Sequence, residues 1–214
     1  EPFKKLVNQG MIQGRSLLTK ENTIEGIPAG MHVPLSLTGP GDKIYKEKLI
    51  ELISKDSRFS NIDIEKDVKW EDESQSFISL QFEVEKMSKS KYNVVNPDDM
   101  INQFGADTFR MFEMFLGPIE AHKPWDTNGI EGVSKFVRKV WRLYGFDENG
   151  KLSVKEEATK DELKILHKAI KKVTDDIERF SFNTAVSALM IAVNDFGKLT
   201  PLSRTTLETL PVLM

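Results

Sequence analysis

The hydrophobic pattern of this chain changes its period near residue 96, and that change constrains the fold more than any other feature. Apolar and polar side chains alternate over 76–84, which is typical of a β-strand. Asn96 is a natural helix N-cap with Pro97 at the first helical position, and apolar residues recur at helical spacing from there onward. The pattern therefore predicts an α+β part followed by an all-α helical bundle.

The first part is expected to combine short strands with two helices. Pro34 cannot donate a backbone hydrogen bond, so the strand that contains it is expected at a sheet edge. Turn residues at 39–42 are expected to open a helix. The expected elements are a helix at 2–10, strands at 11–18, 31–37, 61–70 and 76–84, and a helix with the apolar face Tyr45, Leu49, Leu52 and Ile53.

The second part is expected to contain helices alone. Phe136 and Trp141 share the apolar face of one of them and are expected in the core rather than stacked on bases. Met100, Met111 and Met114 are expected in the core of the first helix pair. The expected helices run from 97 to 105, 106 to 116, 129 to 144, 156 to 180, 181 to 199 and from about 203 onward.

Composition narrows the class of protein. Hydrophobic residues make up 39% and charged residues 29% of 214 residues, which fits one or two globular domains and excludes disordered and collagen-like chains. No apolar run approaches the roughly 18 residues of a membrane span. The absence of cysteine excludes disulfides and thiolate metal sites and favours a reducing, cytoplasmic setting. With 30 basic and 33 acidic residues, any contact with nucleic acid must rest on local patches.

The loop at 86–91 is the strongest candidate for chemistry. It reads KMSKSK, between the alternating strand and the helix that Asn96 caps. Loops between a strand and a helix are where α/β enzymes place ligand-binding residues. An ordinary solvated basic turn is the alternative. Lys91 lies at the end of the loop and is expected to be solvated.

Two basic stripes on predicted helices could follow a phosphate backbone. The spacing i, i+3, i+4, i+7 puts the members of the first on one helix face. An ordinary solvated helix face is the alternative for both stripes. The first consists of Lys135, Arg138, Lys139 and Arg142, and the second of Lys164, Lys168, Lys171 and Lys172.

The loop motif resembles the signature of the class I aminoacyl-tRNA synthetases. KMSKS at 86–90 is that signature, and the family continues it with runs such as NVVNP and GADTxR, here at 93–97 and 105–110. Tyr92 stands where the family usually has glycine, so a positive φ is less accessible there. The flanks resemble the leucyl enzymes in particular, through residues 1–12, 113–118, 123–125 and 129–133.

The resemblance implies three regions. Residues 1–18 and 80–128 would be the remainder of a Rossmann-type class I catalytic domain. Residues 19–79 would be an α+β insertion of the leucine-specific type. Residues 129–214 would be part of a helical anticodon-binding domain. The chain is thus expected to be a piece of a longer enzyme.

The resemblance also implies a reaction and a site. Leucine would attack the α-phosphate of ATP to give leucyl-adenylate and pyrophosphate, and the leucyl group would pass to tRNA(Leu). Lys86 and Lys89 would be the catalytic lysines that stabilise the pyrophosphate leaving group. Met87, Ser88 and Ser90 complete the expected ATP-binding loop, although the two hydroxyls could equally cap the turn.

Further expectations follow for cofactors and partners. ATP would be a substrate and bring Mg²⁺, with no metal site in the chain itself. The stripe at 135–142 would bind tRNA. The full enzyme is expected to be a cytoplasmic monomer that binds neither membrane nor DNA. The family's other ATP signature, which contains paired histidines, is absent, so the chain alone is expected to be inactive. A valyl, isoleucyl or methionyl enzyme and a stand-alone tRNA-binding module remain alternatives.

Overall fold

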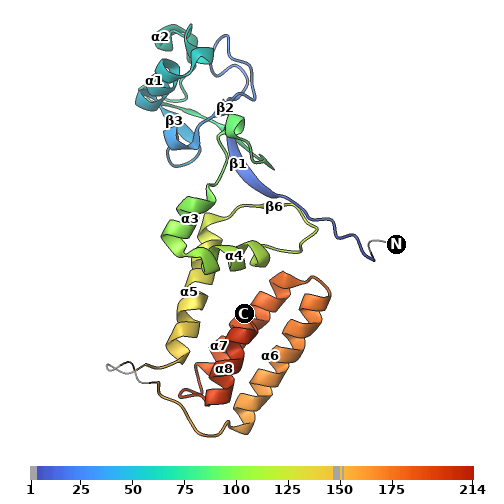
Figure 1. The fold of residues 1–214 in the computed structure, drawn as a ribbon. Helices are drawn as coiled ribbons and strands as arrows, with labels where there is room; N and C mark the ends of the chain where they lie inside the picture. Colours follow the sequence, from blue (N-terminus) through green and yellow to red (C-terminus); the bar gives the residue numbers. More distant parts are fainter. Residues whose placement is uncertain (1–3, 147–149, 151) are drawn as a thin grey trace. The chain divides into compact units, whose positions relative to one another are not determined.

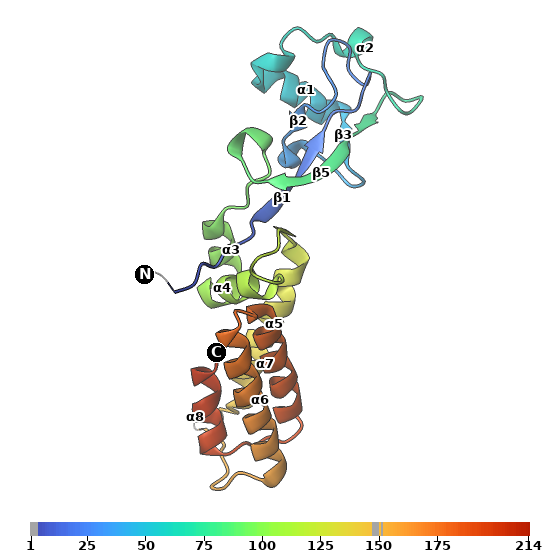
Figure 2. The same cartoon turned by 90° about the vertical axis from the view of Figure 1, so that its right-hand side faces the viewer.

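The computed structural model describes residues 4–146, 150 and 152–214 and divides into two compact units (Figures 1 and 2). Unit 1 comprises residues 1–10 and 96–214, and unit 2 comprises residues 11–95. Strands and short helices mix in unit 2, whereas unit 1 is almost entirely helical. The predicted order of a mixed part followed by a helical part is therefore confirmed, while the division into three domains stays a prediction.

Unit 2 is built on antiparallel strand pairs. The central strand β1 (Ile12–Leu18) pairs with β2 (His32–Val33) on one side and with β5 (Gln81–Lys86) on the other, in a register that places Gln13 opposite Lys86. The other elements are the paired strands β3 (Lys43–Tyr45) and β4 (Phe77–Ser79), the helices α1 (Lys46–Lys55) and α2 (Ile64–Asp67), and the 3₁₀ turns η1 (Leu35–Leu37), η2 (Ser57–Phe59) and η3 (Lys89–Lys91).

The core of unit 2 joins the sheet residues to α1 and to η2. Leu49 and Leu52 of α1 are buried as predicted, whereas Tyr45 ends β3 and caps the helix from outside. The buried cluster consists of Leu17, Ile24, Val33, Leu37, Ile44, Leu49, Leu52, Phe59, Val68, Ile78 and Leu80.

Two predicted strands of unit 2 differ from the structure. Residues 61–70 form no strand, because the Asp63 side chain accepts a hydrogen bond from the Glu65 amide and starts the short helix α2 instead. The strand expected at 76–84 is split at Leu80, since the chain leaves β3 there and pairs with β1. Phe82 and Val84, beyond this break, are therefore exposed.

Two further predictions need correction. Only His32–Val33 of the strand expected at 31–37 is extended, because Pro34 cannot continue the ladder and η1 follows, although β2 does lie at a sheet edge. Within the range 2–10, the described residues 4–10 form no helix. The Gly10 amide donates to the Ile119 carbonyl at 2.8 Å, so this segment runs extended beside another part of unit 1.

Unit 1 contains the predicted helices. Asn96 caps the first one by accepting a hydrogen bond from the Asp98 amide at 3.2 Å, with Pro97 at the first helical position. The elements are α3 (Pro97–Phe104), α4 (Ala106–Phe115), the short strand β6 (Lys123–Pro124), α5 (Thr127–Leu143), α6 (Lys160–Glu178), α7 (Phe182–Phe196) and α8 (Arg204–Val212).

The cores of unit 1 confirm one aromatic prediction and correct another. Phe136 is buried among α5, α6 and α7. Trp141 is 68% exposed and packs on Phe146 at 5.4 Å between ring centroids, because the buried stripe of α5 passes through Val140 beside it. Met100 and Met111 pack against buried residues as predicted, but Met114 is exposed.

A buried carboxylate joins α6 to α8. Glu162 is completely buried, and its Oε1 accepts hydrogen bonds from the Ser203 amide at 2.8 Å and the Ser203 hydroxyl at 2.6 Å. Burial acts to raise the pKa of the Glu162 carboxyl, but the hydrogen bonds from Ser203 and Thr206 outweigh it and hold that pKa below its usual value. The N-terminus of α8 is thus fixed by a charge-assisted cap.

Candidate functional site

The KMSKS loop leaves the sheet at the end of β5. Lys86 is the last residue of this strand and is held in register opposite Gln13 of β1. After Met87 and Ser88 the chain turns through η3, which the Lys91 amide closes by donating to the Ser88 carbonyl at 3.0 Å. Strand pairing therefore fixes the start of the loop, and one tight turn fixes the place of Lys89.

Asn93 fastens the two ends of the loop together. It is 2% exposed, and its Oδ1 accepts a hydrogen bond from the Ser88 amide at 2.8 Å. Its Nδ2 donates to the hydroxyl of Ser16 on β1 at 2.9 Å and, over a longer 3.4 Å, to the Lys86 carbonyl. A single buried amide thus spans the signature from its first residue to its third.

Gly14 explains how Asn93 can reach this position. A Cβ atom at Gly14 would lie 2.2 Å from the Asn93 carbonyl oxygen, far inside contact distance. Only a glycine in β1 lets the backbone after the loop pass so close to the strand. Neither residue was predicted as part of the site, although Asn93 opens the run NVVNP at 93–97, because neither belongs to KMSKS itself.

The two signature lysines are exposed, and neither forms an ion pair within the described part of the chain. Lys91 differs from its prediction as a solvated residue, since its ammonium contacts the Glu85 carboxylate. The other Glu85 oxygen lies 2.6 Å from Nε2 of His32 on β2. Burial, and next the Lys91 charge, lower the pKa of the His32 imidazole.

The serines of the signature contact each other. The hydroxyl oxygens of Ser88 and Ser90 lie 2.9 Å apart, with either able to donate. This arrangement favours a part in holding the turn, which was one of the two roles that the sequence left open. Met87 is half-buried beside them.

The basic stripe on α5 is exposed along its length. The Lys135 ammonium lies 3.9 Å from Glu131, and Lys139 donates to the side-chain oxygen of Asn194 at 2.9 Å. Arg138 and Arg142 have no ion pair to any residue that the structure describes. These two arginines are therefore the members of the stripe best able to contact a phosphate.

The second stripe borders a groove between α6 and α7, which lie side by side (Figures 1 and 2). The groove has a volume of about 870 Å³, with Ile165, Ala188 and Ile191 among its apolar lining residues. Lys172 pairs with Asp176 at 2.6 Å, which leaves Lys164, Lys168 and Lys171 without an ion pair inside the described ranges.

Comparisons with known proteins identify the family of this chain. Residues 65–123 match the family model of class I tRNA synthetases (I, L, M and V), and residues 160–209 match the anticodon-binding domain of tRNA ligase. Leucine–tRNA ligases from Flavobacterium psychrophilum and Cytophaga hutchinsonii are each 46% identical to this chain over its whole length. The chain belongs to the leucyl family of class I aminoacyl-tRNA synthetases.

The chain spans 23% of the length of each of these two leucyl relatives. A leucine–tRNA ligase from Bacteroides thetaiotaomicron is also 46% identical to this chain, which again spans 23% of its length. Among solved structures, an Agrobacterium radiobacter LeuRS in a ternary complex with tRNA and LeuAMS matches 60% of this chain and 18% of its own, at 31% identity and a TM-score of 0.49.

Proposed function

We propose that this chain supplies the ATP-binding loop and part of the anticodon-binding bundle of a leucine–tRNA ligase. The enzyme activates leucine with ATP to leucyl-adenylate and transfers the leucyl group to tRNA(Leu). The observation that carries the proposal is the pair Lys86 and Lys89, exposed and without ion pairs in the described ranges, on a loop fixed from within by Asn93. The 46% sequence identity to leucine–tRNA ligases, which extends over the whole chain, supports leucine as the amino-acid substrate.

The two lysines act on the leaving group. When leucine attacks the α-phosphate, the bond to the bridging oxygen breaks and negative charge collects on pyrophosphate. Ammonium groups at Lys86 and Lys89 stabilise this charge more in the transition state than in bound ATP. Because the turn is already formed, little reorganisation is needed when the charge develops.

Magnesium enters with ATP in this proposal. Within the described ranges no three His, Cys, Asp or Glu side chains cluster in a way that could hold a metal ion. Mg²⁺ commonly reaches such sites bound to substrate phosphates. The residues of this chain would contribute cationic hydrogen-bond donors to ATP, and the ion would supply additional positive charge.

We assign roles to the remaining parts of the chain from their resemblance to the family. We assign residues 1–18 and 80–128 to a Rossmann-type catalytic domain, 19–79 to a leucine-specific insertion and 129–214 to the anticodon-binding part, with Arg138 and Arg142 on tRNA phosphates. The paired-histidine signature is absent from this sequence, so the chain by itself forms no leucyl-adenylate. Leucine-dependent exchange of pyrophosphate into ATP by the pure chain would contradict this.

The proposed cellular location, oligomeric state and partners follow from the same assignment. We propose that the enzyme works as a cytoplasmic monomer, which the absence of cysteine fits. No helix in the described ranges is long and apolar enough to cross a membrane. Leucine, ATP and tRNA(Leu) are the proposed partners.

Binding of Mg·ATP followed by amide NMR shifts tests the proposal. Shifts centred on Lys86 to Ser90 are expected, and Lys89→Ala should remove them. Lys69→Ala is the matched control, because Lys69 is an exposed lysine of the same unit without an ion pair in the described ranges. Shifts that survive Lys89→Ala, or that disappear equally with Lys69→Ala, would contradict a phosphate site at the loop.

A further inference from the structure

Tyr92 follows the signature directly and has a left-handed backbone. Its φ and ψ are 54° and 25°, and its amide donates to the Lys89 carbonyl at 3.3 Å as the C-cap of η3. A side chain makes this conformation unfavourable, whereas glycine adopts it freely. The turn that carries Lys89 therefore contains a residue that resists its geometry, and something else must hold it there.

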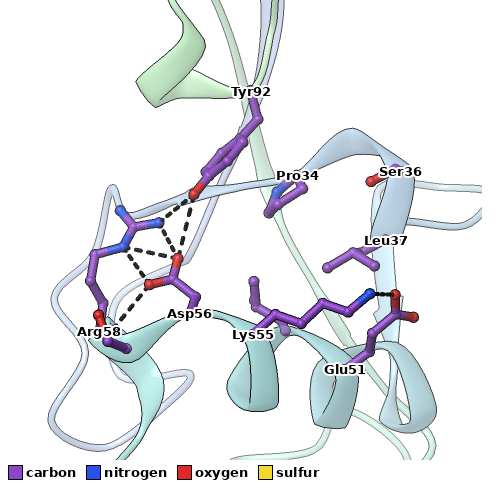
Figure 3. Close-up of a pocket in the computed structure, with 10 residues that line it drawn as sticks. Pro34, Ser36, Leu37, Glu51, Lys55, Asp56, Arg58 and Tyr92 are labelled. Carbon is purple, nitrogen blue, oxygen red and sulfur yellow. Dashed lines mark hydrogen bonds and ion pairs between the residues drawn. The ribbon is translucent and has the colours of Figure 1, made fainter.

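The Tyr92 hydroxyl makes the side-chain contacts that hold Tyr92 in this conformation (Figure 3). It accepts a hydrogen bond from Nη2 of Arg58 at 3.0 Å and donates a longer one to Oδ2 of Asp56 at 3.4 Å. Tyr92 is 37% exposed, and it borders an open pocket of about 590 Å³ rather than filling a core. The hydroxyl, more than apolar packing, thus connects Tyr92 to its neighbours.

The partners of Tyr92 are themselves firmly placed. Asp56 caps η2 by accepting from the Arg58 amide at 3.0 Å, and it receives the Arg58 guanidinium through Nε at 3.0 Å and Nη2 at 2.5 Å. The Arg58 guanidinium is also the main reason that the pKa of the Asp56 carboxyl lies below its usual value. The next residue, Phe59, is completely buried in the core of unit 2.

We propose that Tyr92 is a positioning residue, which ties the Lys89 turn to the Asp56–Arg58 pair of the predicted insert. The inference rests on the proposed function, because it gives the insert a part in the same reaction. Tyr92 touches no reacting atom in this scheme. It holds the turn, and through the turn it sets where the Lys89 ammonium can reach the leaving pyrophosphate.

Hydrogen exchange of the Lys91 and Tyr92 amides tests the contact in the present chain. Tyr92→Phe, which removes only the hydroxyl, should speed exchange about 2- to 10-fold, the range of one typical hydrogen bond, because the contacts to the charged Arg58 and Asp56 are exposed to solvent. Arg58→Ala should also speed exchange, and the double variant should show less than the sum of the two effects, since both changes remove the hydrogen bond between Arg58 and Tyr92. Unchanged exchange in Tyr92→Phe, or fully additive effects, would overturn the proposal.

Tyr45→Phe is the matched control for the lost hydroxyl. Tyr45 has a similar exposure, 40%, and its hydroxyl makes no hydrogen bond to the residues that the structure describes. Exchange at Lys91 and Tyr92 should not change in this variant. Tyr92→Gly adds a second check, because the turn should persist without the strain while Arg58→Ala loses its effect.

Kinetics of the complete synthetase separate positioning from a structural role. With the active fraction measured by titration, Tyr92→Phe should lower the rate constant of ATP–pyrophosphate exchange about 2- to 10-fold and leave the KM for leucine unchanged. An unchanged rate constant, or a change confined to the leucine KM, would overturn the positioning role. A wild-type enzyme without leucine-dependent exchange would instead overturn the proposed function, and the amide measurement would still decide the contact.

Discussion

Replacing Asn93 by alanine should loosen both the signature loop and unit 2. The substitution removes the acceptor of the Ser88 amide and the donor to the Ser16 hydroxyl, which are bonded at 2.8 and 2.9 Å. Ser16 and Asn93 are 0% and 2% exposed, so no solvent can replace the lost contacts without rearrangement.

The size of the effect follows from these contacts. Each of the two short hydrogen bonds contributes about 0.5–1.5 kcal/mol, and the 3.4 Å contact to the Lys86 carbonyl adds little. The Ser16 hydroxyl, left buried without its donor, adds about 1 kcal/mol more. Unit 2 should therefore lose about 2–4 kcal/mol of its free energy of unfolding.

Native-state hydrogen exchange of the β1 amides measures this loss. If these amides exchange through unfolding of unit 2, a loss of about 2–4 kcal/mol accelerates them roughly 30- to 1000-fold. Asn61→Ala, at an exposed asparagine of the same unit, is the control and should change exchange less than about threefold. Acceleration below about tenfold in Asn93→Ala would refute the argument that this buried amide fastens the loop to the sheet.

Two further predictions concern unit 1. Because hydrogen bonds lower the pKa of Glu162 in the folded state, its stabilising effect is present above the unfolded value of about 4.3 and is lost as pH falls through the folded value. Glu162→Gln should therefore flatten the fall of the thermal midpoint below about pH 4.3, and an unchanged acid profile would contradict this. Replacing Arg138 and Arg142 by alanine should reduce the slope of log K for tRNA against log salt by about 1.4–1.8. Loss of the same two charges at Lys164 and Lys168 should reduce it less, and equal reductions would count against a specific track on α5.

Local signals predicted the helices of unit 1 well from residue 96 onward, although the helix expected at 2–10 is not formed by the described residues 4–10. The caps of α3 and α8 are formed by Asn96 and Ser203, each of which accepts a hydrogen bond from an amide two or three residues later. Such contacts depend only on neighbours in the sequence, so a short window of residues is enough to predict them. The place of the signature lysines between a strand and a helix was predictable for a similar reason, since the motif and its flanks are contiguous.

Strand boundaries in unit 2 were not predictable in the same way. The alternation over 76–84 is real, but β4 pairs with β3 and β5 pairs with β1, and the change of partner at Leu80 depends on segments far away in the sequence. On α5, Trp141 shows a related limit of prediction from the sequence pattern. Helical periodicity placed it on the apolar face, but one residue of rotation separates it from the buried Val140.

The residues that hold the site were missed because their partners are distant. Asn93 bonds to Ser16, 77 residues earlier, and Tyr92 bonds to Arg58, 34 residues earlier. Neither separation leaves a period or a spacing in the sequence. The one available signal was the tyrosine at a position where the family usually has glycine, because a residue unsuited to the expected backbone calls for a compensating contact.

The loop combines residues that are held by their neighbours with two lysine side chains that are free of ion pairs in the described ranges, and this combination suits the proposed chemistry. Ser88, Lys91 and Tyr92 are held by Asn93, Glu85 and the Asp56–Arg58 pair, which come from three separate parts of unit 2. Lys86 precedes these residues and Lys89 lies among them, and neither lysine has an ion pair in the described ranges. A phosphate ligand therefore meets ammonium groups that need not first give up a carboxylate, on a backbone that is already ordered. Both conditions lower the cost of stabilising charge on a leaving group, so the contacts that hold the loop support the two lysines without occupying their ammonium groups.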